Sequence, residues 1–279
     1  MSVVQSLQRL EQLDIEEIEG LKHLIGSGRG HGSNTNMELS AAKGNSRSLM
    51  PNLKRVRIFN CIKLESWFPI CCMEGLAQLQ TVHIVDLPKL QTIFPVECNL
   101  QNLKSLLICK FVTKKWRLGE VLFSTSVAQS LQQLKFLVIK GIDGLKHIIG
   151  NGRGDCSNTS ILPTRNSPFL MPNLNILEIN DCNELESFLP ICCVEGLTQL
   201  QLLEIVDVPK LRHVFGECDH TDHSSLQYGN QILLPRLESM IFKRLENLID
   251  MCPKNYPARW HSPDEKIVED CPNFATTSV

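Results

Sequence analysis

The twelve residues from 79 to 90, LQTVHIVDLPKL, contain the pattern that decides the fold. Apolar side chains stand at positions 79, 82, 84, 87 and 90, so the steps between them are three, two, three and three residues. The step of two between Val82 and Ile84 predicts a short β-strand with one buried face. The steps of three predict turns that bring Leu79 and Leu90 to the same side. A unit this short cannot bury its apolar side alone, so the pattern predicts several stacked units.

The pattern recurs along the whole chain, which predicts one continuous repeat structure. An amphipathic helix or a coiled coil is the alternative, because the three-residue steps between Leu7 and Leu21 also approximate a helical period. The alternating positions are rich in Val and Ile, and Pro and Gly interrupt the units, which favours strands. We therefore predict an α/β fold with a parallel sheet along one side. Eight units begin at Leu10, Leu53, Leu79, Leu103, Leu134, Leu174, Leu200 and Leu237, and residues 266–274 contain a truncated ninth.

A second and longer repeat contains these units. Residues 6–95 match residues 130–216 in two ungapped blocks, which are identical at 42 of 71 aligned positions. A match of this extent indicates that one block was duplicated in tandem. We expect a single domain over residues 1–279. Polar segments rich in Gly, Ser and Asn predict loop insertions on this domain rather than linkers, at 26–49, 150–169 and 216–231.

The composition argues against several classes of protein. The formal net charge is −2 and the isoelectric point is about 6.4, which argues against nucleic acid or an anionic membrane surface as the main partner. No apolar run approaches the roughly 20 residues that span a bilayer, and the N-terminus has no signal-peptide pattern. The 12 cysteines include no C-x-x-C pair, so they predict buried thiols in a reducing compartment, the cytoplasm.

Three kinds of segment contain chemically reactive residue types, and each has a simpler structural explanation. Cys218, His220 and His223 are potential zinc ligands, but their spacing matches no standard ligand set and they lie in a Ser-rich insertion. The adjacent cysteines of the two PICC segments are duplicated, which indicates a structural role rather than two nucleophilic centres. The basic stretch 110–117 predicts a solvated edge on an overall acidic chain. We expect no enzymatic activity, no cofactor and no metal site.

Four segments resemble the leucine-rich repeats of a known family. Together they are similar to the irregular repeats of plant intracellular disease resistance receptors of the coiled-coil, nucleotide-binding class. Cys61 and Cys182 occupy a position where such repeats often carry Asn or Cys. The resemblance implies a horseshoe-shaped solenoid with a concave parallel sheet, with irregular loops and short helices on its convex side, and a role in plant defence. The segments are MPNLKRVRIFNCIKLES (50–66), GLAQLQTVHIVDLPKLQTIF (75–94), MPNLNILEINDCNELES (171–187) and VEDCPNF (268–274).

The chain differs from these receptors in the motifs of their nucleotide-binding module. It contains no G-x-x-x-x-G-K-[S/T] phosphate-binding loop, and the Gly-rich stretch 26–32 lacks the lysine. We therefore expect the recognition part of a receptor without its ATPase switch. The resemblance implies a protein partner: a pathogen effector, a guarded host protein or the nucleotide-binding domain of a receptor. A generic leucine-rich scaffold, such as the substrate-binding half of a ubiquitin-ligase adaptor, is the alternative.

The outward-pointing strand residues are the candidate binding site, because they line the concave face of such a solenoid. The two copies differ most at these positions: of nine aligned outward positions, only Val85 and Val206 are identical. Two of the changes reverse a charge, from Glu16 to Lys140 and from Arg57 to Glu178. Drift of exposed positions is the alternative explanation. We predict a protein-binding face formed by Asp14, Glu16, Arg55, Arg57, Phe59, His83, Phe136, Val138, Lys140, Ile176, Glu178, Asn180, Leu202 and Glu204.

Overall fold

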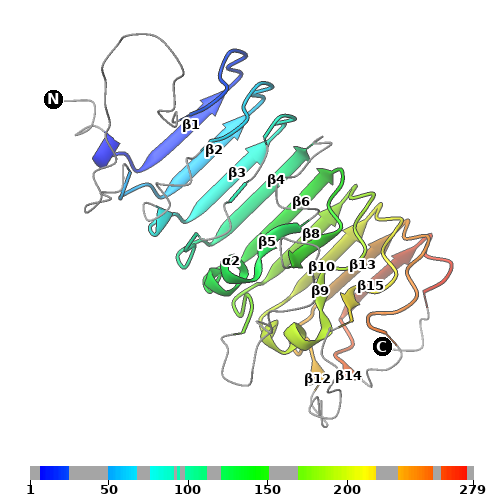
Figure 1. The fold of residues 1–279 in the computed structure, drawn as a ribbon. Helices are drawn as coiled ribbons and strands as arrows, with labels where there is room; N and C mark the ends of the chain where they lie inside the picture. Colours follow the sequence, from blue (N-terminus) through cyan, green and yellow to red (C-terminus); the bar gives the residue numbers. More distant parts are fainter. Residues whose placement is uncertain are drawn as a thin grey trace, which may run out of the picture.

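Nine parallel strands form one sheet in which the order of the strands follows the chain (Figure 1). The computed structural model describes residues 7–24, 50–67, 76–90, 93–94, 98–111, 121–150, 169–217, 232–253 and 259–274. The prediction of stacked parallel strands is confirmed for all eight units and for the ninth. The strands are β1 (Gln12–Glu16), β2 (Arg55–Phe59), β3 (Thr81–Val85), β4 (Ser105–Phe111), β6 (Phe136–Ile142), β8 (Ile176–Asn180), β10 (Leu202–Val206), β13 (Ser239–Lys243) and β15 (Glu265–Glu269).

Neighbouring strands pair without any stagger between units. Val56 of β2 lies opposite Leu13 of β1 and Val82 of β3, and the same correspondence continues to β15. The step of two in the sequence pattern therefore places every inward residue on one face of the sheet and every outward residue on the other. Outward positions form three straight rows across the nine strands.

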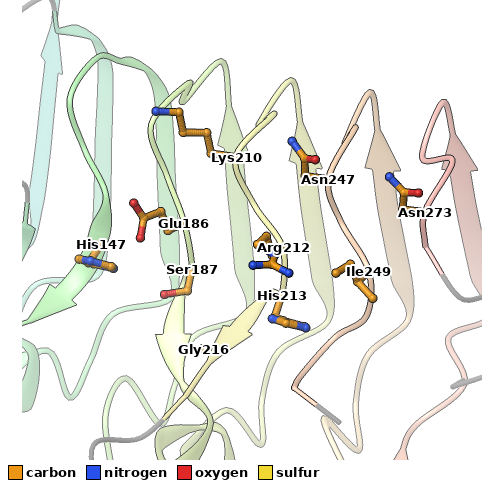
Figure 2. Close-up of a pocket in the computed structure, with 10 residues that line it drawn as sticks. All are labelled: His147, Glu186, Ser187, Lys210, Arg212, His213, Gly216, Asn247, Ile249 and Asn273. Carbon is orange, nitrogen blue, oxygen red and sulfur yellow. The ribbon is translucent and has the colours of Figure 1, made fainter.

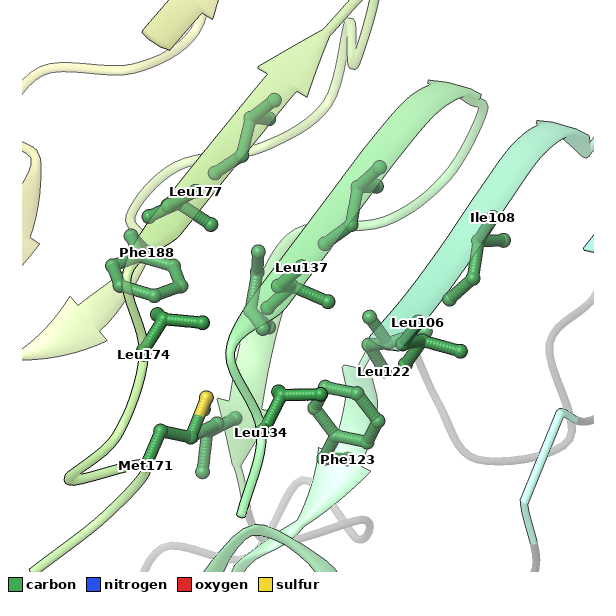
Figure 3. Packing of buried hydrophobic residues seen from close by; sticks show 14 of the residues in the cluster. Leu106, Ile108, Leu122, Phe123, Leu134, Leu137, Met171, Leu174, Leu177 and Phe188 are labelled. Carbon is green, nitrogen blue, oxygen red and sulfur yellow. The ribbon is translucent and has the colours of Figure 1, made fainter. Parts of the chain in front are cut away.

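The inward face of the sheet packs into one continuous apolar core. Leu137 and Leu177 point from β6 and β8 to the same side, and Leu134 and Leu174 from the preceding turns join them (Figure 3). All four side chains are completely buried. Each contributes about 1.5–3 kcal/mol by leaving water. In β1, which has a neighbour on one side only, Leu13 is half-buried instead.

The far side of the core carries short strands and helices. Three short parallel ladders lie there, together with the six-residue helix α2 (Thr125–Ser130) and the 3-10 helix η2 (Ile191–Gly196). Ser124 caps α2 by accepting a hydrogen bond from the backbone N–H of Val127 at 3.3 Å. The ladders pair β5 (Val121–Ser124) with β7 (His147–Gly150), β9 (Leu189–Pro190) with β11 (Phe215–Gly216), and β12 (Ile232–Leu233) with β14 (Arg259–Trp260).

Aromatic rings form a second row of contacts beneath this far side. Trp67 packs edge-on against Phe94, with ring centroids 6.1 Å apart, and Phe94 stacks on Phe123 at 6.3 Å. The indole Nε1–H of Trp67 donates a hydrogen bond to the backbone carbonyl of Ile93 at 2.7 Å. A similar row further along the chain joins Phe188, Phe215 and Trp260. These rings connect successive units on the side away from the sheet.

The chain leaves the sheet through a residue with left-handed backbone. The N–H of this residue extends the ladder by one bond, as in Asn60 to the carbonyl of Val85 and Asp86 to the carbonyl of Cys109, both 3.0 Å. Asn, Asp and Gly adopt this conformation at least cost, which explains why they predominate here. Within the described units the residues at this position with positive φ are Glu17, Asn60, Asp86, Gly141, Asp181, Asp207, Arg244 and Asp270.

The predicted loop insertions fall largely outside the described residues. This holds for all of 26–49, for 151–168 of the second insertion and for 218–231 of the third. The described ends of these segments connect units of the same sheet. The prediction that they are insertions on a single domain therefore stays a prediction. No helix within the described residues is long and apolar enough to cross a membrane.

Candidate protein-binding face

All the predicted site residues lie on the face of the sheet that points away from the core, which we call the open face. Their exposure decreases from the edge inward. Asp14, Glu16, Arg55 and Arg57 on β1 and β2 are exposed, whereas the residues of the central strands are mostly half-buried by their neighbours. Phe136 is the exception, because 41% of its surface is exposed at the start of β6.

An apolar band crosses the open face obliquely. Phe59, Val85 and Cys109 lie side by side on β2, β3 and β4. In the adjacent row, two residues earlier along each strand, Leu107 of β4 is the partner of Val138 of β6. Phe136, Ile176 and Leu202 are side by side in the third row, on β6, β8 and β10. We define the apolar band as these eight residues, which connect all three outward rows into one surface.

Positive charge borders the band at its β2 end. The guanidinium of Arg57 lies over the ring of Phe59, with Cζ 5.3 Å from the ring centroid. Arg55 lies on the same side of the band and donates a hydrogen bond to Oε1 of Gln12 at 3.5 Å. Burial, reinforced by the charges of Arg57 and Arg55, lowers the pKa of His83 from its ordinary value. The two arginines are the cations of this border, and Asp14 and Glu16 lie beyond them on the edge strand β1.

Negative charge borders the opposite side of the band at its β8 and β10 end. Glu178 and Glu204 are partners on these strands. Lys140 forms an ion pair with Glu178, with Nζ 2.9 Å from Oε2, and it also experiences the charge of Glu204. The hydrogen bond to Glu178 is the main cause that raises the pKa of Lys140. Two carboxylates around one ammonium leave this border net negative.

Asn180 completes this border, beside Lys140 on the neighbouring strand. Its side-chain oxygen is buried and has no hydrogen-bond partner among the described residues. The predicted site residues are therefore brought together in two groups. Asp14, Glu16, Arg55 and Arg57 form a charged edge with His83 beside it, whereas Phe59 joins the residues from β6 to β10 in the apolar band and its acidic border.

A polar hollow of about 850 Å³ lies along one flank of the later units (Figure 2). Pockets for small organic ligands are lined mainly by apolar side chains. Among the residues that line this flank pocket, Ile249 is the one large apolar side chain, so the pocket lacks the apolar lining of a small-ligand site. The pocket is lined by His147, Glu186, Ser187, Lys210, Arg212, His213, Gly216, Asn247, Ile249 and Asn273.

Histidines of this flank belong to a contact that repeats between units. Nδ1 of His23 lies 2.8 Å from the hydroxyl oxygen of Ser66, and His147 forms a backbone bridge with Ser187 at the equivalent place. His23 and Ser66 also form a backbone bridge, and a third such bridge joins His213 to Asp250. Recurrence at one position in successive units is expected for a structural contact, whereas a nucleophile and its base form one centre. In the sequence, the duplicated segment GLKH, at 20–23 and 144–147, identifies the first two histidines as equivalent, but it does not reveal their partners.

The described residues contain no group of three or more side chains able to hold a metal ion. The potential ligands Cys218, His220 and His223, and residues 112–117 of the basic stretch, lie outside the described part of the chain. The repeat cysteines are structural in their geometry. Burial raises the pKa of the Cys182 thiol to about 12, and its S–H donates to the carbonyl of Asn180 at 3.5 Å. A thiol held protonated in this way is a poor nucleophile.

Comparison of the chain with models of known protein families and with curated proteins found no match.

Proposed function

We propose that this chain binds a protein through the open face of its sheet, as the recognition part of a plant intracellular immune receptor. The observation that carries the proposal is the apolar band, with Phe136 exposed at its centre. Parallel sheets ordinarily have both faces covered. An apolar surface bordered by opposite charges on a sheet face is what a protein interface requires.

The assignment to plant defence rests on the four segments that resemble leucine-rich repeats of that class. Horseshoe curvature with a concave inner face, a cytoplasmic location and recognition without catalysis belong to the same proposal. The partner in this proposal is a pathogen effector, a guarded host protein or the nucleotide-binding domain of a receptor. The core supports this role, because stacked units hold the outward residues in fixed rows on a rigid sheet.

A triple substitution of the open face tests the proposal. Affinity capture from extract of pathogen-challenged leaves identifies partners, and each is then measured as a purified protein. Arg57→Ala, Phe59→Ala and Phe136→Ala together are expected to abolish binding without changing the circular-dichroism spectrum. The matched control replaces exposed residues elsewhere, Arg9, Ile62 and Phe169, with alanine. Partners that bind the triple variant and the control equally well would reject the open face as the binding site.

A further inference from the structure

We infer that the partner presents to the open face an amphipathic α-helix of about 18 residues, acidic along one edge of its apolar stripe and basic along the other. This inference rests on the proposed binding function and adds the chemistry of the partner. It follows from the length of the apolar band, from the hydrogen-bonding state of the sheet and from the charges on the two borders of the band.

The apolar band has the dimensions of one helix. It spans five strand spacings, from β2 to β10, and four residues along the strand direction, from the row of Phe59 to the row of Leu202. With about 4.8 Å between strands and about 3.3 Å per residue, the band is about 27 Å long. A helix of that length has about 18 residues, or five turns. The band is one or two side chains wide, as is the apolar stripe of an amphipathic helix.

The open face favours a helix over an extended segment. Each strand along the band is hydrogen-bonded to neighbours on both sides. A partner that docks on this face can therefore contact side chains but finds no free backbone groups to pair with. An extended segment lying on Phe136, Ile176 and Leu202 would turn unpaired N–H and C=O groups toward an apolar surface, which is costly. A helix satisfies its own backbone bonds and buries only its apolar stripe. Packing of helices on the faces of parallel sheets follows the same logic.

The borders of the band set the charge pattern of the helix. Arg55 and Arg57 lie to one side of the band at its β2 end, and Glu178 and Glu204 lie to the other side at its β8 and β10 end. Complementary charge therefore requires carboxylates on one edge of the stripe near one end of the helix. It requires Lys or Arg on the opposite edge near the other end. This pattern fixes both the rotation of the helix and its direction on the sheet.

A selection experiment on the full-length chain tests the inference. The probe is a yeast-displayed library of random segments of about 20 residues, long enough to form the predicted helix. Segments that bind the chain are counter-selected against Phe136→Asp/Leu202→Asp, which places charges in the apolar band. The control is Ile62→Asp/Phe169→Asp, at exposed apolar positions away from the open face. Circular dichroism confirms that both variants are folded.

The expected segments lose binding with the band variant and keep it with the control. They carry apolar residues at i, i+3, i+4 and i+7, with acidic and basic residues on opposite edges. A synthetic copy with its two charged edges exchanged is expected to bind about tenfold more weakly. The chain variant Arg55→Glu/Arg57→Glu is expected to reduce that preference, whereas Lys63→Glu, an exposed residue outside the face, leaves it unchanged.

The results that overturn the inference differ from those that overturn the binding function. Band-dependent segments with alternating apolar residues, or with no charge preference, would exclude the helix but keep the open face as a binding site. Segments that bind the band variant as well as the unchanged chain would reject both. A library that yields no binding segment would also contradict the helix, because it contains sequences of the required pattern.

Discussion

Lys140 and Glu178 form a diagonal ion pair on the open face, and the residues equivalent to them in the first copy are Glu16 and Arg57. Nζ of Lys140 lies 2.9 Å from Oε2 of Glu178, one row apart on adjacent strands. Glu16 and Arg57 occupy the same diagonal on β1 and β2. The two charge reversals between the copies are therefore one coupled change that keeps opposite charges side by side. Divergence of the open face has exchanged the sign of the charge at both positions; Lys140 and Glu178 form an ion pair, whereas Arg57 lies over the ring of Phe59.

Reversal of this pair in the second copy is expected to be tolerated only as a whole. Lys140→Glu places a third carboxylate beside Glu178 and Glu204 and is expected to lower the free energy of unfolding by about 0.5–1 kcal/mol. Adding Glu178→Arg recreates the arrangement of the first copy and is expected to restore most of this loss. Urea denaturation at low salt measures both variants, and the difference should shrink in 1 M salt. A double variant no more stable than the single one would show that the pair is not coupled.

Stability is expected to fall at alkaline pH because of the buried repeat cysteine. Burial raises the pKa of Cys182 from its ordinary value of 9.0 to about 12, so the folded state holds the thiol proton more tightly than the unfolded state. This contribution is complete below pH 9 and is lost as the pH rises from 9 to 12. Its full size is on the order of a few kcal/mol.

The substitution Cys182→Val isolates this effect, since Val208 fills the equivalent position of the next unit. The variant is expected to lose less stability than the unchanged chain between pH 9 and pH 11. Guanidinium denaturation at pH 8, 9, 10 and 11 gives the two slopes. Identical slopes would mean that this thiol does not contribute to the alkaline loss.

Trp67 is expected to be the most costly single truncation on the far side of the core. It is 2% exposed, packs against Phe94 and donates to the carbonyl of Ile93. Trp67→Ala leaves a large cavity and is expected to cost about 3–5 kcal/mol. Trp67→Phe keeps an aromatic ring but leaves the carbonyl unpaired, for an expected cost of about 1–3 kcal/mol.

The control for this series is Trp260→Phe. Trp260 stacks on Phe215 but is only partly buried, so its replacement is expected to cost less than either change at Trp67. Urea denaturation followed by far-ultraviolet circular dichroism ranks the three variants. A Trp67→Phe variant as stable as the unchanged chain would argue against the indole hydrogen bond.

The left-handed position after each strand offers a stabilising substitution. Glu17 has φ of 55° there, in a conformation that costs a glutamate more than it costs an asparagine. Glu17→Asn is expected to stabilise the chain by up to about 1 kcal/mol. Gly141, with φ of 64° at the equivalent position of β6, supplies the opposite test, since Gly141→Val is expected to destabilise by about 1–2 kcal/mol. Thermal unfolding of both variants gives the signs, and a destabilising Glu17→Asn would contradict the argument.

The strands and their order were predictable because one short rule governs them. The step of two identifies inward residues such as Val82 and Ile84, and stacking of identical units forces the same register throughout. The open-face residues follow from the same rule, since they are the alternate positions. The sequence pattern therefore located the candidate site without any knowledge of the far side.

The far side was not predictable in the same way, because its spacing varies between units. Trp67 and Phe188 both lie eight residues after the ends of their strands, as the duplication requires. The rings that continue these rows are spaced differently, because Phe123 lies 12 residues after β4 and Trp260 lies 17 residues after β13. The oblique course of the apolar band also depends on which neighbours share a row, and this emerges only when all registers are known. Asn or Asp recurs after five of the strands, at positions 60, 86, 181, 207 and 270, and was the available signal for the left-handed turn.

Because neighbouring strands pair without stagger, the number of repeats sets the distance between contacts on the open face. Each unit advances the sheet by one strand spacing without rotating its side chains to the other face. Gain or loss of a whole unit between β2 and β10 therefore shifts Arg57 relative to Glu204 by about 4.8 Å and leaves the register of the strands unchanged. Tandem duplication of a gene segment can therefore change the distance between a cationic and an anionic contact in steps of one strand spacing. No point mutation in the apolar core is needed.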